Sequence, residues 1–193
     1  MIRPMIALAF LALTACKQEA QETPNPVTLS AASVGHYCQM NMLEHPGPKA
    51  QVHLEGLPDA PLFFSQVRDA IAYQRMPEQS HAITAIFVSD MGKAPSWEAP
   101  GRDNWIAATE AHYVVGSNKK GGMGAPELVP FASRQGAEQF AARHGGHVSR
   151  LSDIPDAAAL APVAANDPAP ENPDEAQQGY AERLRALSRG ADD

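Results

Sequence analysis

The segment FSQVRDAIAYQ, residues 64–74, has the apolar spacing of an amphipathic helix. Its apolar face consists of Phe64, Val67 and Ile71. The segment FASRQGAEQFA, residues 131–141, begins in a similar way about 67 residues later and offers Ser133 as a helix cap. Two helices at equivalent places indicate that the chain repeats one structural unit.

Predicted strands accompany both helices in the same order, strand-strand-helix-strand. Apolar patterns place them at 51–54 and 82–88 around the first helix, and at 111–115, 127–131 and 147–151 around the second. A further strand at 36–40 completes the first unit. Each unit is too small to be stable alone, so the two would stabilise each other by packing. The sequence therefore predicts an α+β fold of two packed ββαβ units, residues 31–95 and 96–154.

The overall composition excludes several classes of protein. The 193 residues include 22 acidic and 15 basic side chains, giving a formal net charge of −7. That charge argues against a nucleic-acid partner, because phosphate binding needs a clustered basic face. The two cysteines are too few for a disulfide-dense scaffold or a four-cysteine zinc site.

Residues 1–15 are predicted to be a lipoprotein signal peptide. Arg3 precedes the apolar run Met5–Leu13, which is too short to span a bilayer. The run ends in Leu13-Thr14-Ala15-Cys16, which resembles a lipobox, where cleavage precedes the cysteine and its thiol receives a diacylglycerol. The alternative is an ordinary signal peptide with a chance cysteine.

An acylated Cys16 would anchor the chain at the periplasmic face of a membrane, because buried acyl methylenes hold a lipoprotein on the bilayer. Lys17 stands where inner-membrane lipoproteins have a retaining aspartate, which favours the outer membrane. Residues 16–30 are mostly polar and contain proline, so they are predicted to form a flexible tether.

Residues 155–193 form an acidic tail rich in alanine and proline. Large apolar side chains are few there, so the tail cannot bury enough surface to fold alone. Within it, Asn172-Pro173-Asp174-Glu175 is a good helix start and predicts a short helix over 174–188.

Cys38 is the only thiol left if Cys16 carries lipid, so it is either buried and inert or chemically used. In the segment Cys38-Gln39-Met40, a strand would project the thiol and the thioether to one face. A soft sulfur pair of this kind suits Cu(I). The alternative is a small buried cysteine beside a methionine that fills a gap in the core.

Met123 lies in the second candidate segment, Gly121-Gly122-Met123-Gly124. Its glycine neighbours offer nothing to pack against, so the loop could hold the thioether against an ion; the alternative is a hairpin turn in which Met123 folds back over the core. Met91 is a similar methionine with polar neighbours. The histidines that could add a nitrogen ligand are His36, His45 and His112, although a lone histidine is more often structural.

Four segments carry a family resemblance: His36–Asn41, Phe64–Asp69, Val88–Gly92 and Gly121–Ala125. Together they resemble the NosL family of lipoprotein copper chaperones for nitrous oxide reductase, from the lipobox to about Pro155 and without the acidic tail. The resemblance implies a fold similar to part of organomercurial lyase. It also implies periplasmic delivery of Cu(I) to the copper–sulfide centre of apo nitrous oxide reductase, with an ABC-type transporter complex as docking partner.

The resemblance implies the copper ligands Cys38, Met40 and Met123, with Met91, His45 and His112 as candidate secondary ligands. A chaperone of this kind is not an enzyme. Two alternatives use the same residues. One is a general copper-binding or storage lipoprotein. The other is a thiol-dependent enzyme of the organomercurial-lyase type, which is disfavoured because that chemistry needs more than one cysteine.

Overall fold

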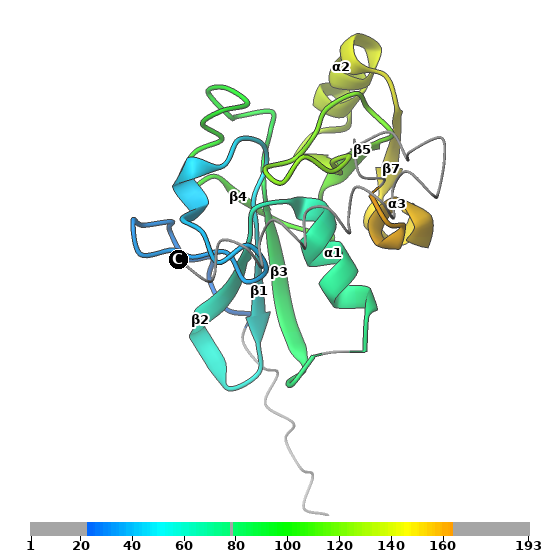
Figure 1. Cartoon of the computed structure of the whole chain (residues 1–193). Helices are drawn as coiled ribbons and strands as arrows, with labels where there is room; N and C mark the ends of the chain where they lie inside the picture. The colour runs from blue at the N-terminus through cyan, green and yellow to red at the C-terminus, as the bar shows by residue number, and fades with distance from the viewer. Residues whose placement is uncertain (1–22, 78, 164–193) are drawn as a thin grey trace, which may run out of the picture.

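The computed structural model describes residues 23–77 and 79–163. Two antiparallel sheets form its framework, with the strand orders β2-β1-β3-β4 and β6-β5-β7 (Figure 1). The strands are β1 (Ala50–Leu54), β2 (Leu57–Phe64), β3 (Ile83–Ser89), β4 (Trp105–Ala107), β5 (His112–Val115), β6 (Val129–Phe131) and β7 (His147–Arg150). The helices are α1 (Val67–Arg75), α2 (Arg134–His144) and α3 (Asp156–Leu160), with short 3-10 helices η1 (Met42–Glu44) and η2 (Leu151–Asp153).

Two ββαβ units recur, as predicted, in the orders β1-β2-α1-β3 and β5-β6-α2-β7. Helix α1 packs on the first sheet and α2 on the second. Phe64 ends β2 and Phe131 ends β6, so both helices begin at equivalent points after a strand. Strand β4 lies in the range 96–154 but pairs with β3, and therefore extends the first sheet.

The predicted strand at 36–40 is wrong. Residues 36–38 form a turn, and β2 is the strand that completes the first unit. Pro58 and Pro61 interrupt the apolar run of β2, and the strand accommodates them because it lies at the edge of the sheet. The first helix consequently begins at Val67, since Phe64 belongs to β2.

One hydrophobic core serves both units. Ile71 of α1 and Tyr113 of β5 are buried in the same cluster, and a fully buried side chain the size of Ile71 contributes roughly 1.5–3 kcal/mol. Side chains alternate along β5, so Val114 faces a second cluster that contains Phe131 and Phe140 of α2. Strand β5 of the second unit therefore contacts a different core cluster on each face, and one of these clusters joins it to the first unit.

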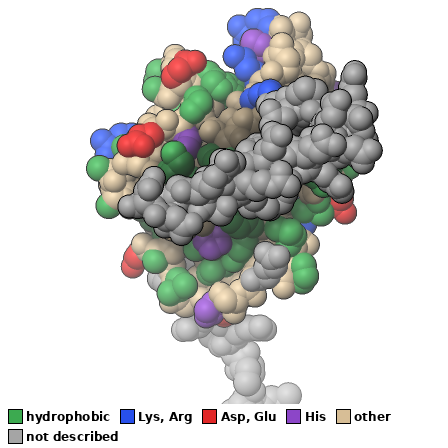
Figure 2. Space-filling model, viewed as in Figure 1, with side chains coloured by type: hydrophobic (Ala, Val, Ile, Leu, Met, Phe, Trp, Pro, Cys, Tyr) green, Lys and Arg blue, Asp and Glu red, His purple; other side chains and the backbone are tan. Residues whose placement is uncertain are grey.

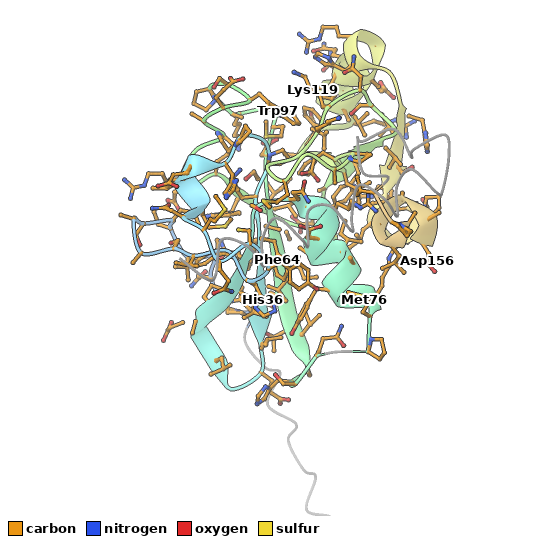
Figure 3. All side chains as sticks on the ribbon, viewed as in Figure 1. His36, Phe64, Met76, Trp97, Lys119 and Asp156 are labelled. Carbon is orange, nitrogen blue, oxygen red and sulfur yellow. The ribbon has the colours of Figure 1, made fainter. Side chains whose placement is uncertain are left out.

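The chain remains packed after β7. Ile154 and Ala159 are buried in the main core, and Asp156 of α3 pairs with Arg75 of α1 at 2.9 Å (Figure 3). The start of the predicted tail therefore belongs to the packed domain. The predictions for residues 1–15, for Cys16 and for a helix over 174–188 concern residues outside the described ranges. Within residues 23–77 and 79–163, no helix combines the length and apolar character needed to cross a membrane.

Candidate metal site

Cys38 lies in a turn that docks on the edge strand β2. The Gly35 N–H donates to the Met40 carbonyl at 2.9 Å and closes the turn. The His36 ring packs against Phe64 of β2, with 5.6 Å between the ring centroids (Figure 3). Because Cys38 and Met40 lie in a turn, the prediction that a strand aligns them on one face is wrong.

Two features shape this turn. Gln39 has a φ of 55°, which is the left-handed region that side chains rarely adopt, and its amide donates to the His36 carbonyl at 2.7 Å. The thiol of Cys38 folds back over Gly35, where an added Cβ would clash with the sulfur. The turn therefore depends on glycine at position 35, and it directs the Cys38 sulfur toward the protein rather than away from it.

His45 lies beside Cys38, and η1 sets the distance between them. Asn41 caps η1 by accepting a hydrogen bond from the Leu43 N–H at 2.9 Å. The His45 Nε2 then lies 3.8 Å from the Cys38 sulfur, and the residue is buried, with 7% of its surface exposed. The structure thus brings one of the candidate secondary ligands next to the predicted thiol.

The second ring nitrogen of His45 faces the glycine-rich loop. Nδ1 lies 3.2 Å from the Gly122 carbonyl oxygen. A carbonyl can only accept, so a neutral His45 carries its proton on Nδ1 in this hydrogen bond. Its Nε2 then presents a lone pair toward Cys38, which is the arrangement that a metal-binding imidazole uses.

The glycine-rich loop fits closely against its surroundings. A Cβ at Gly122 would lie 2.8 Å from the His45 Cβ and 2.9 Å from the Ser65 carbonyl oxygen. Such contacts are closer than real Cβ atoms show, so a side chain at this position would push the loop outward. The loop therefore places Met123 directly after a residue that contacts His45.

Both predicted methionine ligands reach the surface. Met123 is 50% exposed and Met40 is 47% exposed. The alternative in which Met123 folds back over the core is therefore wrong.

On the face shown in Figure 2, hydrophobic side chains and histidines lie together, whereas a group of lysines and arginines lies at the end that carries α2.

The other two candidate ligands are Met91, in the loop after β3, and His112 of β5. Met91 packs against the second core cluster, and its N–H donates to the Pro130 carbonyl at 2.9 Å. His112 of β5 lies 3.3 Å from the guanidinium of Arg150. Burial and the charge of Arg150 lower the pKa of His112. Met91 is therefore used in packing, and His112 contacts Arg150.

A buried lysine supports the site, and no local pattern in the sequence pointed to it. Lys49 is 1% exposed, and its ammonium donates to the Pro46 carbonyl at 2.9 Å and the Gly47 carbonyl at 2.6 Å. Burial lowers its pKa to about 8, while the charges of Glu127 and Cys38 oppose the shift. Lys49 thereby fixes the backbone that follows His45.

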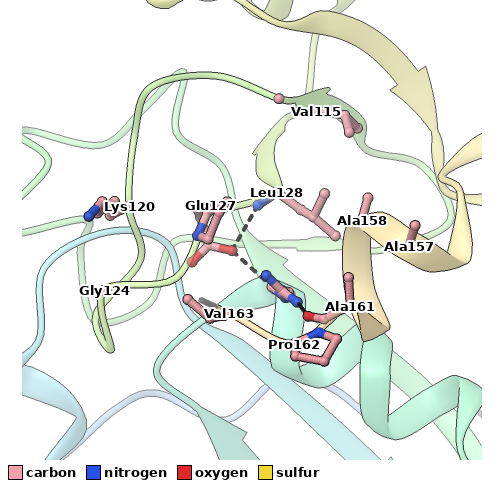
Figure 4. A pocket seen from close by; sticks show the side chains of 13 residues that line it. Val115, Lys120, Gly124, Glu127, Leu128, Ala157, Ala158, Ala161, Pro162 and Val163 are labelled. Atoms are coloured by element: carbon pink, nitrogen blue, oxygen red, sulfur yellow. Dashed lines mark hydrogen bonds between the residues drawn. The ribbon is translucent and has the colours of Figure 1, made fainter. Parts of the chain in front are cut away.

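Glu127 is a second buried group that no local sequence pattern singles out. Its Oε1 accepts the N–H of Arg68 at 3.0 Å and the N–H of Leu128 at 2.9 Å (Figure 4). Among the described residues, Oε2 has no hydrogen-bond partner. Burial raises the pKa of the carboxyl to about 8, so it is mostly protonated at neutral pH. The side chain lines a pocket of about 400 Å³.

Within the described ranges, no three side chains drawn from His, Cys, Asp and Glu converge on a common point that could hold a metal ion. The group that does come together is Cys38, His45 and the loop of Met123. Cys38 is the one free cysteine of the described residues. A thiol, an imidazole and exposed thioethers form a set of soft and borderline donors.

The fold and this donor set define a small α+β protein with a candidate soft-metal site between its two units. The sequence model of the NosL family matches residues 26–159. Two curated relatives are each named copper-binding lipoprotein NosL. The one from Achromobacter cycloclastes is 53% identical over 189 residues, covering 97% of this chain and 95% of the relative. The one from Stutzerimonas stutzeri is 34% identical over 183 residues, covering 91% and 93%. The chain belongs to the NosL family.

A solved structure agrees with this assignment. The crystal structure of the copper chaperone NosL from Shewanella denitrificans matches with a TM-score of 0.63 and 29% sequence identity. The match covers 69% of this chain and 97% of the solved chain. The described domain therefore has the fold of that chaperone.

Proposed function

We propose that this chain is a membrane-anchored Cu(I) chaperone that delivers copper for assembly of the copper centre of nitrous oxide reductase. The observation that carries the proposal is the convergence of the Cys38 thiol, the His45 imidazole 3.8 Å away and the loop of Met123 on one site. Relatives named copper-binding lipoprotein, and a structural match named copper chaperone, support it.

The donor set explains the choice of copper and of its reduced state. Cys38, Met40 and Met123 supply sulfur, which prefers Cu(I), whereas Cu(II) prefers nitrogen and oxygen ligands. Binding would deprotonate the Cys38 thiol, so the affinity for copper should rise with pH. His45 supplies a nitrogen through Nε2 when the sulfur ligands leave a position open.

The exposure of the two methionines suits a protein that must release its cargo. Met40 and Met123 are about half exposed, so a ligand of the acceptor can approach the ion from the solvent side. Neutral thioethers can be displaced one at a time, while the buried side of the site keeps hold through Cys38. Copper would then pass through a shared intermediate without entering solution.

The proposal includes partners and a location. Apo nitrous oxide reductase is the acceptor, and an ABC-type transporter complex of the same maturation pathway is the docking partner. Lipid on Cys16 attaches the chain to a membrane at its periplasmic face, and Lys17 favours the outer membrane. The chain acts as a carrier and not as an enzyme.

An anaerobic competition titration against a Cu(I) chelator tests the proposal. Cys38→Ala should lose stoichiometric Cu(I) binding, and Met123→Ala should weaken it without lowering the melting temperature. Met76→Ala is a matched control, because Met76 follows the C-terminal end of α1 and is not among the candidate copper ligands (Figure 3). Undiminished affinity in Cys38→Ala would sink the proposal. Transfer of copper to apo reductase in the presence of chelator separates a chaperone from a storage protein, which would keep its copper.

A further inference from the structure

The start of α1 lacks a cap of its own. Gln66 is the N-cap residue, and within the described chain its side chain makes no capping hydrogen bond to the first turn of the helix. At the equivalent place before α2, Ser133 accepts the Gly136 N–H at 3.1 Å in the usual way. Gln66 is buried, with 3% of its surface exposed, so its side-chain amide has partners other than the first turn of α1.

Gln66 binds the backbone of the glycine-rich loop. Its Oε1 accepts the Met123 N–H at 3.0 Å and the Ala125 N–H at 3.2 Å. Its Nε2 donates to Asp69 Oδ2 at 2.9 Å, which fixes the orientation of the amide so that the oxygen faces the loop. One amide oxygen therefore holds the backbone on both sides of Gly124.

The loop returns a hydrogen bond to the helix. Glu127, just after the loop, accepts the N–H of Arg68 in the first turn of α1 at 3.0 Å. The contact is close, because a Cβ at Gly121 would clash with Glu127 Oε2 and lie 2.8 Å from the Gln66 Cγ. The helix start and the loop thus satisfy each other's backbone groups across 57 to 59 residues of sequence.

We propose that Gln66 is a positioning residue for copper binding, which holds the loop so that the Met123 thioether faces Cys38 and His45. The inference rests on the proposed function. Gly121, Gly122 and Gly124 have no side chains to anchor the segment, and an unanchored glycine-rich loop would lose conformational entropy on closing over a metal. The two hydrogen bonds to Gln66 remove part of that loss before copper arrives.

The test is a double-mutant cycle in Cu(I) affinity. Gln66→Ala should lower affinity about tenfold, the effect expected from removing a buried acceptor for two N–H groups. In the Met123→Ala background the same substitution should change affinity less than about twofold, because the group it positions is gone. Equal losses in both backgrounds would overturn the proposal, and so would a lower melting temperature with unchanged affinity.

Gln51→Ala is the matched control. Gln51 is also fully buried and its Oε1 accepts a backbone N–H, that of Val27 at 2.8 Å, but it lies on β1. This variant should lower the melting temperature and leave Cu(I) affinity unchanged. If Gln66→Ala does not fold, Asp69→Ala takes its place, because it frees the amide that Asp69 orients and should weaken affinity in the same direction.

Hydrogen exchange in the copper-free protein separates this proposal from the proposed function. Gln66→Ala should speed exchange of the Met123 and Ala125 amides relative to wild type, while Gln51→Ala should not. If Cys38→Ala leaves copper binding intact, the proposed function fails, yet the exchange rates still report whether Gln66 orders the loop. Unchanged exchange at both amides would refute the positioning role whatever the metal.

Discussion

The two strand-to-helix junctions of the molecule occupy equivalent places and do different work. After β6, Ser133 caps its own helix α2 through a local hydrogen bond. After β2, Gln66 leaves that task to Glu127 from the other unit and binds the backbone of the Met123 loop instead. At the first junction a long-range contact stands in place of a local cap, and it ties the helix to the candidate metal site.

The loops that carry Met91 and Met123 also differ, both in the junction that they contact and in the exposure of the methionine. The loop after β3 docks on the second junction, where Asp90 accepts the Ala132 N–H at 3.0 Å, and Met91 packs into the second core cluster. The loop after β5 docks on the first junction, and Met123 remains 50% exposed. One loop therefore contributes a methionine to packing and the other presents a methionine to solvent.

The largest difference between the loops should appear when their glycines are replaced. In Gly122→Ala the new Cβ would meet the His45 Cβ at 2.8 Å and the Ser65 carbonyl at 2.9 Å, and backbone atoms cannot easily give way. We expect a loss of about 1–3 kcal/mol in unfolding free energy and a marked loss of Cu(I) affinity. Denaturant unfolding and the competition titration measure the two effects.

Gly92→Ala in the other loop is the control. Its Cβ would lie 3.1 Å from Asp90 Oδ1 and 3.7 Å from Phe131, so a small shift of a side chain accommodates it. It should leave Cu(I) affinity unchanged. Equal copper defects in the two glycine variants would break the contrast between the loops.

The first junction should respond to pH because its helix is capped by a buried carboxyl. The pKa of Glu127 is about 8 in the folded protein against an ordinary value of 4.5, so the folded state binds more protons between these values. Stability should therefore fall as pH rises from about 4.5 to 8. In Glu127→Gln that contribution is absent, so the variant should gain melting temperature relative to wild type as pH increases.

The titrations of most other groups cancel when wild type is compared with Glu127→Gln. Lys49 and Asp69 interact electrostatically with Glu127, so their titrations do not cancel between the two proteins. The pKa values of His112 and His144 are lowered, so these two residues add stability with rising pH in both proteins. A difference in melting temperature that stays constant from pH 5 to 8 would contradict the assignment of a buried, protonated Glu127.

Truncation of the packed methionine should give a smaller effect on stability. Met91→Ala removes a partly buried side chain from the second cluster and should cost about 1–2 kcal/mol of unfolding free energy without altering copper binding. Met123→Ala should do the opposite, because exposed side chains change stability by less than about 0.5 kcal/mol. Reversed outcomes would exchange the roles given to the two loops.

The smallest expected effect is at the second junction. Ser133→Ala should cost about 1 kcal/mol through loss of the α2 cap, and Cu(I) affinity should not change. Thermal unfolding and the same titration decide this. A copper defect in Ser133→Ala would mean that both junctions, and not the first alone, shape the site.

Features with a local pattern could be predicted from the sequence. Apolar periodicity located both helices and the strands β1, β3, β5, β6 and β7 within a few residues. Prolines concealed the edge strand β2, whose pairing with β1 tolerates them. The repeat predicts a strand at 36–40, but the left-handed backbone of Gln39, which no sequence pattern reveals, makes this segment a turn.

The candidate ligands and the residues that support them also differ in how far a local sequence pattern predicts them. Cys38 and Met40 are candidates because a thiol and a thioether two residues apart suit a soft ion, and Met123 because glycines flank it, but only the family resemblance implies all three as ligands. His45 was one of several equivalent histidines until the fold brought it beside Cys38. Gln66 and Glu127 act over separations of 57 to 59 residues, and a buried polar contact at that range leaves no local signature.

X-ray absorption on the Cu(I)-loaded protein and its two methionine variants tests the central claim most directly. Wild type should show two or three sulfur neighbours at roughly 2.2–2.3 Å, a distance close to that of zinc–thiolate bonds. Met123→Ala should lose one sulfur neighbour, while Met91→Ala should match wild type. A sulfur lost in Met91→Ala and retained in Met123→Ala, or a first shell without sulfur, would contradict a copper site built from the Cys38 turn and the loop that Gln66 holds.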